Sequence, residues 1–243
     1  MNWIFPIAGK GKRVRSLGSY KPFIEIKQKK ILEWFLISIK RKFKKGDKLY
    51  FITTEQFERK YKVLSTIKVL LNKLKIKNKF VVEILKKTPN GPALSVLSII
   101  NTIKGNQSCA VINSDQAIDF YLPSTIKKDR IYMGVHFNNH GKSSYINLEK
   151  KGKISEIFEK KLISYYASSG VYIFGSVKII KKCYQLYYSK IRIRKKELNM
   201  SDIINNYLKT KKTYSDSLTT YLKYDLGNKK DIENFVNFIE SKL

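Results

Sequence analysis

The first 115 residues alternate between short apolar runs and longer segments with helical periodicity. Apolar runs typical of buried strands cover 2–8, 49–53, 80–85 and 109–113, and a short extended segment covers 23–27. The spacing of apolar positions between them predicts helices over 30–44, 56–74 and 91–103. Strands that alternate with helices are typical of a parallel sheet with helices on both faces.

After Asp115 the pattern changes to strands joined by short turns. Strands are predicted at 131–137, 144–149, 153–159 and 169–174, and helices at 176–189, 201–209 and 229–241. Neither a flexible linker nor an internal repeat interrupts the chain. We therefore expect an α/β fold, with a single Rossmann-like three-layer domain over 1–243, a mostly parallel central sheet and an antiparallel section after residue 120.

Charge is the unusual number in the composition. Forty-nine Lys and Arg against nineteen Asp and Glu give a net charge of +30, which favours anionic partners. The excess is spread along the chain, and its densest cluster, 40–45, ends a predicted helix, where cations complement the helix dipole. No Cys/His finger and no RNA-binding aromatic signature is present. We interpret the charge as a solvated surface and expect no nucleic-acid partner, with a basic nucleic-acid-binding protein kept as an alternative.

The apolar segments also bear on localisation. None approaches the roughly 18 residues of a membrane span, and no signal peptide is evident. Cys109 and Cys183 fall in a strand and a helix and form no disulfide framework, which suits a reducing, cytoplasmic setting. The last residues, Ser241-Lys242-Leu243, match a peroxisomal address, a pattern of low specificity.

The first strand ends in a glycine loop that carries several cations, Ala8-Gly9-Lys10-Gly11-Lys12-Arg13. Glycines allow a backbone to approach a ligand closely, and loop N–H groups can face phosphate oxygens. Arg13 and Lys21 add positive charge at the same place. The loop is neither a dinucleotide fingerprint, since Val14 stands where the third glycine belongs, nor a Walker A loop. A phosphate cradle and a plain tight turn both remain open at this point.

Asp115 closely follows the strand at 109–113, at the edge where open α/β sheets bind ligands. A carboxylate there suits Mg²⁺ held against phosphates, although a single Asp after a strand is more often a turn or helix cap, the interpretation we favour for Asp119. Three other segments carry polar residues at predicted turns and are ordinary loops if taken singly: 88–93, 154–160 and 224–228.

Taken in order, these segments resemble the sugar-1-phosphate nucleotidylyltransferase (pyrophosphorylase) family, from residue 4 to about 235. The N-terminal matches are residues 8–13 to the family motif Gly-Gly-x-Gly-Thr-Arg, 20–22 to Pro-Lys-Pro, 91–93 to Gly-Thr/Leu-Ala and 113–115 to Asn-Gly-Asp. The C-terminal matches are residues 159–161 to Glu-Lys-Pro, 170–174 to Gly-x-Tyr-x-Phe and 225–228 to Asp-x-Gly-Thr/Asn.

The chain departs from the family motifs at several positions: Ala8, Lys12, Tyr20, Ser114 and Lys161. The departures leave the acceptor open. Relatives that transfer CMP to phosphocholine or to a phosphorylated amino-acid amide of the phosphoglutamine type are the natural comparison.

The resemblance implies transfer of NMP from an NTP to a sugar 1-phosphate or similar metabolite, with release of pyrophosphate, for surface glycan or capsule precursors. It favours CTP or UTP/dTTP, with residues 1–120 as the nucleotide-binding part and 121–243 as the acceptor-binding part. It makes Arg13 and Lys21 catalytic, and Asp115 and Asp225 ligands of Mg²⁺. Its nucleotide-binding residues are Ala8, Gly9, Lys10, Gly11, Lys12, Thr88, Asn90, Gly91 and Ser114, and its acceptor-binding residues are Glu159, Lys160 and Gly170.

One alternative enzyme class also begins with a nucleotide-binding α/β unit and uses an acid with a divalent metal: the glycosyltransferases that consume nucleotide sugars. The segment Asn113-Ser114-Asp115 keeps only one acid, whereas such enzymes carry an Asp-x-Asp pair. Pyrophosphate release separates the two classes. The sequence leaves the oligomeric state open.

Overall fold

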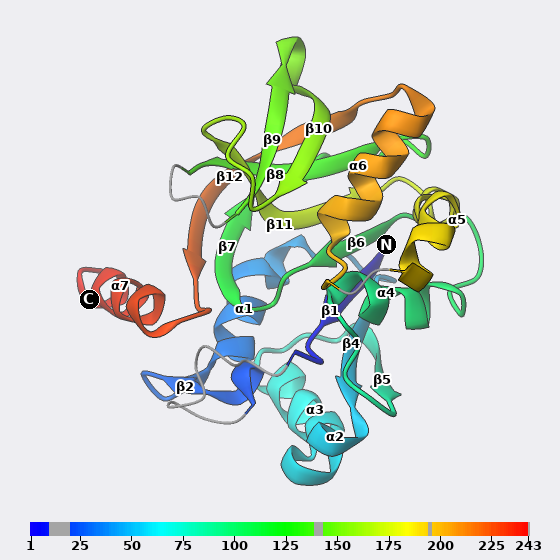
Figure 1. Cartoon of the computed structure of the whole chain (residues 1–243). Helices are drawn as coiled ribbons and strands as arrows, with labels where there is room; N and C mark the ends of the chain where they lie inside the picture. Colours follow the sequence, from blue (N-terminus) through cyan, green and yellow to red (C-terminus); the bar gives the residue numbers. More distant parts are fainter. Residues whose placement is uncertain (10–19, 139–142, 194–195, 243) are drawn as a thin grey trace. The chain divides into compact units, whose positions relative to one another are not determined.

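The computed structural model describes the chain except residues 10–19, 139–142, 194–195 and 243 (Figure 1). The chain divides into two compact units that alternate along the sequence. Unit 1 comprises Met1–Ile4, Pro89–Ile112 and Phe120–Thr220, and unit 2 comprises Phe5–Thr88, Asn113–Asp119 and Tyr221–Leu243. The predicted nucleotide-binding part (1–120) and acceptor-binding part (121–243) do not coincide with these two units. That division of the chain and the single domain both stay predictions.

Unit 1 is built on a sheet with the neighbour order β1, β6, β11, β8, β12, β10, β9. Parallel pairs join β1 to β6 and β8 to β12, and the other neighbouring pairs in this order are antiparallel. The strands are β1 Asn2–Pro6, β6 Cys109–Ile112, β8 Ile131–Phe137, β9 Ser144–Glu149, β10 Lys153–Glu159, β11 Tyr166–Phe174 and β12 Ser215–Asp225, with the short helix η4 Lys150–Gly152. The ends of β1 (residues 5–6) and of β12 (residues 221–225) belong to unit 2. The helices are α4 Pro92–Ile100, α5 Val177–Ile193 and α6 Met200–Lys211. Figure 1 shows α6 in orange beside β10, where Asn205 Oδ1 accepts the Ile157 N–H at 3.2 Å.

Unit 2 carries the remaining elements. Its strands are β2 Glu25–Ile26, β3 Lys29–Lys30, β4 Lys48–Thr54, β5 Lys79–Leu85 and β7 Gln116–Phe120, of which β4 and β5 pair in parallel. Its helices are η2 Lys21–Phe23, α1 Ile31–Ile39, η3 Lys40–Lys42, α2 Glu55–Tyr61, α3 Val63–Lys73 and α7 Lys229–Glu240. Helix α7 packs its apolar face onto the β2–β3 hairpin and α1, through Phe235, whose ring lies 5.3 Å from Trp34.

The fold is therefore the mixed α/β fold with a central sheet that the alternating pattern predicts. Parallel pairing dominates the early strands, and the antiparallel section is confirmed in strands β8 to β11. Cys109 and Cys183 are buried and free, as expected. Among the described residues, no helix is long and apolar enough to cross a membrane.

Two local predictions were wrong, and one long strand was missed. The helix expected over 56–74 is two helices, because Lys62 adopts a left-handed conformation with φ of 48° that ends α2; Glu58 then accepts the Leu64 N–H at 3.0 Å and caps α3. Asp119 is neither turn nor cap but a residue of β7, ion-paired to Lys42 at 2.6 Å. Strand β12 was not predicted, because its polar residues are half exposed and mask the alternation of period two.

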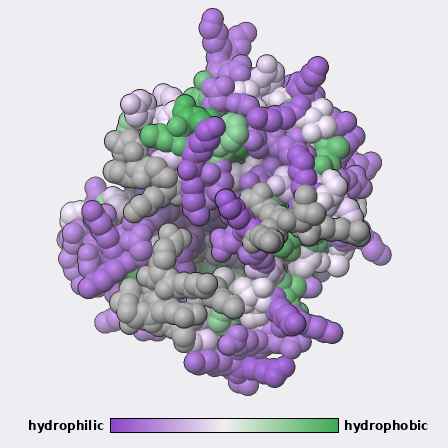
Figure 2. Space-filling view, viewed as in Figure 1, coloured by the Kyte–Doolittle hydropathy of each residue, from purple (hydrophilic) through white to green (hydrophobic). Residues whose placement is uncertain are grey.

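In Figure 2, hydrophilic residues cover most of the visible face, and the hydrophobic patches are small and separate. A largely hydrophilic face is what the interpretation of a solvated surface requires.

Candidate functional site

The short turn that presents Lys21 is held by an aromatic cluster in unit 2. Tyr20 is 1% exposed, and its ring packs 4.3 Å from Phe57 and 5.3 Å from Tyr61. Its hydroxyl hydrogen-bonds to Thr53 Oγ1 at 3.1 Å. Burial raises the pKa of Tyr20 above its usual range, so the ring is a neutral core residue. Tyr20, a departure from the family motif, thus anchors the backbone at the start of η2.

Lys21 points its ammonium at the Asp115 carboxylate. Lys21 Nζ donates to Asp115 Oδ2, and the two side chains are 13% and 42% exposed. The pair joins two segments that lie 94 residues apart in sequence, and both were predicted to be functional. A charge-assisted hydrogen bond of this kind holds the lysine in one place rather than letting it range through solvent.

Strand β12 delivers the second acid to the same neighbourhood. Just past the strand end, the Leu226 N–H donates to the Asp115 backbone oxygen at 2.8 Å, which ties this segment to the residue that carries the first carboxylate. Asp225, the last residue of β12, accepts from Lys223 Nζ at 2.5 Å. Lys21, Lys223, Asp115 and Asp225 therefore form one group, which we call the carboxylate–lysine cluster.

Gly227 lies directly against this cluster. A Cβ atom added at Gly227 would lie 3.3 Å from Lys21 Nζ and 3.8 Å from Asp115 Oδ2. Any side chain longer than alanine would extend into the space beside the lysine and the carboxylate. The glycine of the 225–228 motif is therefore explained by close approach to the charged groups.

The electrostatics of Asp115 follow from these neighbours. Desolvation raises the pKa of Asp115, but the charge and hydrogen bond of Lys21, together with the charge of Lys223, lower it further, so the net pKa lies below the ordinary value. Asp115 is therefore ionised at neutral pH.

Asp115 and Asp225 are the candidate metal ligands of the carboxylate–lysine cluster. Mg²⁺ takes oxygen ligands and is typically bound through one or two carboxylates plus substrate phosphates. Two carboxylates of the cluster fit that use, and among the described residues no set of three His, Cys, Asp or Glu converges to make an all-protein metal site.

The predicted acceptor residues lie in unit 1. Glu159, at the end of β10, accepts from Ser144 Oγ at 2.5 Å and from Ser201 Oγ at 3.1 Å, so its carboxylate is held by two hydroxyls. Lys160 follows in a left-handed turn with φ of 54°, and its Nζ lies 3.8 Å from Glu159 Oε1. Gly170 is buried at φ of 75°, with its N–H donating to Ser168 Oγ at 3.2 Å.

Tyr172 completes this second group. Burial raises its pKa to about 12, with the charge of Glu159 acting in the same direction. We call Glu159, Ser144, Ser201 and Tyr172 the Glu159 cluster; it offers a carboxylate and hydroxyls, which suit hydroxyl or ammonium groups of a ligand.

The turn at Asn90 and Gly91 is explained by packing in unit 1. A Cβ atom added at Gly91 would lie 2.4 Å from the Leu198 backbone oxygen, and the glycine has φ of 115°. The Leu198 N–H donates to the Asn90 oxygen at 2.9 Å, and the Ala93 N–H donates to the Leu198 oxygen at 3.1 Å. The backbone of this turn is thus bonded to 198, and its role in nucleotide binding stays a prediction.

The other predicted nucleotide-binding residues are placed as follows. Ala8 and Ser114 are buried, Gly9 is exposed with open space where a Cβ would stand, and Thr88 is half-buried. Lys10, Gly11, Lys12 and Arg13 lie outside the described residues.

A family comparison decides the class of the protein. The sequence profile of the nucleotidyl transferases matches residues 7–242, nearly the whole chain. The chain belongs to the nucleotidyl transferase family. The family predicted from the order of motifs is thereby confirmed.

Solved structures share the fold of this nucleotidyl transferase. The nucleoside-diphosphate-sugar pyrophosphorylase from Vibrio cholerae RC9 is 20% identical, with a TM-score of 0.81 over 97% of this chain and 99% of that one. A UDP-glucose pyrophosphorylase complexed with UDP-glucose is 18% identical, with a TM-score of 0.75 over 100% and 99%. The inositol-1-phosphate CTP transferase from T. maritima is 18% identical, with a TM-score of 0.74 over 99% and 95%. No match was found among curated proteins.

Sequence reasoning missed four residues of these clusters as site residues: Lys223, Ser144, Ser201 and Tyr172, the last quoted only within the 170–174 motif. Lys223 had a usable signal, since it stands two residues before Asp225 and a strand places such residues on one face. The two serines had none, because they lie 15 and 42 residues from Glu159 in sequence.

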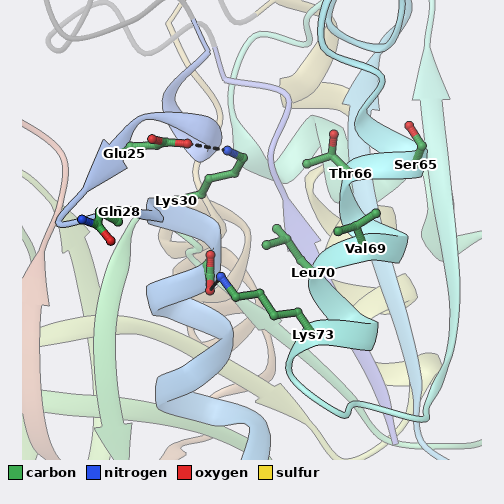
Figure 3. Close-up of a pocket in the computed structure, with 9 residues that line it drawn as sticks. Glu25, Gln28, Lys30, Ser65, Thr66, Val69, Leu70 and Lys73 are labelled. Atoms are coloured by element: carbon green, nitrogen blue, oxygen red, sulfur yellow. Dashed lines mark hydrogen bonds and ion pairs between the residues drawn. The ribbon is translucent and has the colours of Figure 1, made fainter.

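Unit 2 of this nucleotidyl transferase also contains a cavity of about 410 Å³ that no residue of either cluster lines (Figure 3). Helix α1, the β2–β3 hairpin and α3 line it with Glu25, Gln28, Lys30, Glu33, Ser65, Thr66, Val69, Leu70 and Lys73. Its carboxylates are paired, Glu25 with Lys30 at 2.8 Å and Glu33 with Lys73 at 2.7 Å. None of the predicted site residues lines it, so we assign it a structural role.

Replacing Lys73 with methionine should lower the free energy of unfolding by about 1–2 kcal/mol. The Glu33 side chain is only 4% exposed, and loss of its partner leaves a buried carboxylate without a counter-ion, although the 55% exposure of Lys73 moderates the effect. Urea denaturation measures the change. Lys229→Met, which breaks an exposed pair at 3.9 Å, is the control and should cost under about 0.5 kcal/mol. Equal losses in both variants would contradict the role given to Glu33.

Proposed function

We propose that this chain transfers NMP from an NTP to the phosphate of a phosphorylated small metabolite, with release of pyrophosphate. The observation that carries the proposal is the carboxylate–lysine cluster, in which three segments of a nucleotidyl transferase sequence bring Lys21, Asp115 and Asp225 together. The attacking group is an acceptor phosphate oxygen, which is already an anion, so no general base is needed. Catalysis then depends on positioning and on stabilisation of charge.

Each residue of the cluster has a role that its contacts support. Lys21 presents its ammonium from a rigid turn and stabilises the negative charge that develops on the α-phosphate. Arg13 is assigned to the leaving pyrophosphate on the family motif alone. Asp115 and Asp225 hold Mg²⁺, which, when bound, neutralises phosphate charge and makes the phosphorus more electrophilic.

The acceptor is assigned to the Glu159 cluster. Its carboxylate, fixed by Ser144 and Ser201, suits a hydroxyl or ammonium group of the acceptor, and Lys160 is exposed enough to reach a phosphate. A sugar 1-phosphate meets these requirements. A non-sugar phosphate such as phosphocholine or phosphoglutamine, with CTP as donor, is the second candidate, and a neighbour of similar fold is an inositol-1-phosphate CTP transferase.

The setting of the reaction is also part of the proposal. We infer a cytoplasmic enzyme, since Cys109 and Cys183 are free thiols, and we assign its product to bacterial surface glycan or capsule precursors.

A matrix of substrates tests the proposal. Each of CTP, UTP, dTTP, ATP and GTP is mixed with Mg²⁺ and with glucose 1-phosphate, inositol 1-phosphate, phosphocholine or phosphoglutamine, and pyrophosphate is measured. We expect pyrophosphate to be released with one of the five nucleotides, and only when a suitable acceptor is present. Consumption of a nucleotide sugar without pyrophosphate release would instead favour a glycosyltransferase.

Replacing Glu159 with glutamine should raise the KM for the acceptor about 10- to 100-fold with a smaller change in kcat. A hydrogen bond to a charged group is worth about 1.5–3 kcal/mol, and here it is lost from acceptor binding. Initial rates at varied acceptor concentration measure the split between KM and kcat. Glu156→Gln is the matched control, because Glu156 lies on the same strand but pairs with Lys209 at 2.9 Å and belongs to neither cluster. An acceptor KM equal to that of wild type would remove Glu159 from the site.

A further inference from the structure

Lys223 is the least expected member of the carboxylate–lysine cluster. Its side chain is 10% exposed, although lysines are among the residues most often found in water. It stands two residues before Asp225 on β12, so strand alternation places both side chains on one face. Its ammonium is 2.5 Å from Asp225 Oδ2.

The charges of the cluster cancel. Its two carboxylates are each bonded through Oδ2 to one ammonium, Asp115 to Lys21 and Asp225 to Lys223. The four described side chains therefore carry no net charge, with Lys21 as the counter-ion of Asp115 and Lys223 as the counter-ion of Asp225.

Neutrality has a consequence for a divalent cation that arrives alone. A pair of unpaired carboxylates attracts such an ion strongly, whereas here an ammonium competes for the same oxygens and repels the ion. A nucleoside triphosphate changes the balance, because its phosphates attract both ammonium groups and supply further oxygen ligands.

We propose that Lys223 is a built-in counter-ion of Asp225 that keeps divalent cations out of the carboxylate–lysine cluster until a nucleotide's phosphates arrive. Metal and nucleotide then enter together, and Lys223 is a positioning residue that acts through the carboxylates. The inference rests on the proposed function in so far as it takes Asp115 and Asp225 as the metal ligands.

Binding of Mn²⁺ to the nucleotide-free protein tests the proposal, read from the electron paramagnetic resonance signal of the free ion. Wild type should bind Mn²⁺ only in the millimolar range, and Lys223→Met should bind it at least about tenfold more tightly. Lys223→Arg, which keeps the positive charge, should behave as wild type. If Lys223→Met does not fold, as judged by circular dichroism, Lys223→Gln takes its place and is read in the same way.

Lys27→Met is the matched control, because Lys27 also forms an ion pair at 2.5 Å, with Glu240, but both side chains are about half exposed. It should leave Mn²⁺ binding unchanged. Micromolar Mn²⁺ binding by wild type, or equal binding by wild type and Lys223→Met, would overturn the proposal. The assay contains neither nucleotide nor acceptor, so its result is distinguishable from failure of the pyrophosphate-release matrix.

Discussion

Replacing Lys21 with alanine lowers kcat for pyrophosphate release by about 10²–10³-fold, by analogy with loss of one preorganised donor to a transition-state oxyanion. The Lys21 side chain is 13% exposed, and its ammonium is held by Asp115, so it does not have to be ordered at the moment of reaction. Steady-state rates at saturating substrates measure the effect. Lys21→Arg should recover only part of the rate, since the guanidinium is larger and planar.

Lys42→Ala is the control for Lys21→Ala, because the two lysines are nearly matched. Lys42 is 15% exposed and pairs with Asp119 at 2.6 Å, in the same unit, but Asp119 belongs to neither cluster. Its loss should leave kcat within about threefold of wild type, an effect of under about 1 kcal/mol, in keeping with the small worth of half-exposed ion pairs. Wild-type rates in Lys21→Ala, or equal losses in both variants, would show that Lys21 is a structural residue.

Replacing Tyr20 with alanine is expected to lower the free energy of unfolding by about 3–5 kcal/mol, the usual loss for a large aromatic side chain in a core. Tyr20 packs against Phe57, Tyr61 and, at 4.9 Å, Phe23, so truncation leaves a cavity that these rigid rings cannot fill. Urea denaturation measures the loss.

Tyr20→Phe separates the ring from the hydroxyl. It keeps the ring contacts and removes only the hydrogen bond to Thr53, so it should cost about 0.5–1.5 kcal/mol. A loss below about 1 kcal/mol in Tyr20→Ala would contradict the packing described for the cluster. A full loss in Tyr20→Phe would place the stability in the hydroxyl instead.

The elements that the sequence predicted best are those with one buried face. Strands 131–137, 144–149 and 153–159 have the same bounds in sequence and structure, because their apolar residues recur with a clear period or form a buried run. The helix break at Lys62 was missed because no Gly or Pro marks it; a lysine takes the left-handed conformation instead.

Among the candidate site residues, Lys21, Asp115 and Asp225 were predicted from the sequence, Lys21 after the glycine loop, Asp115 after a strand and Asp225 before a glycine turn. Their partners were not. In a chain of net charge +30, the sequence does not distinguish Lys223 from the other lysines as a buried one. Its burial follows only from the packing of β12.

The sequence by itself determined the α/β class, the family and the order of the motifs, because period, glycine placement and residue type are local properties. The tertiary structure alone decided that Asp115 meets Lys21 and that the Lys223 side chain is buried. Asp115 bonds to a lysine 94 residues earlier, while Asp225 takes its counter-ion from two residues before it on the same strand. The first pairing depends on how distant segments come together, and a hydrogen bond is sensitive to shifts of a few tenths of an ångström, which local periodicity does not encode.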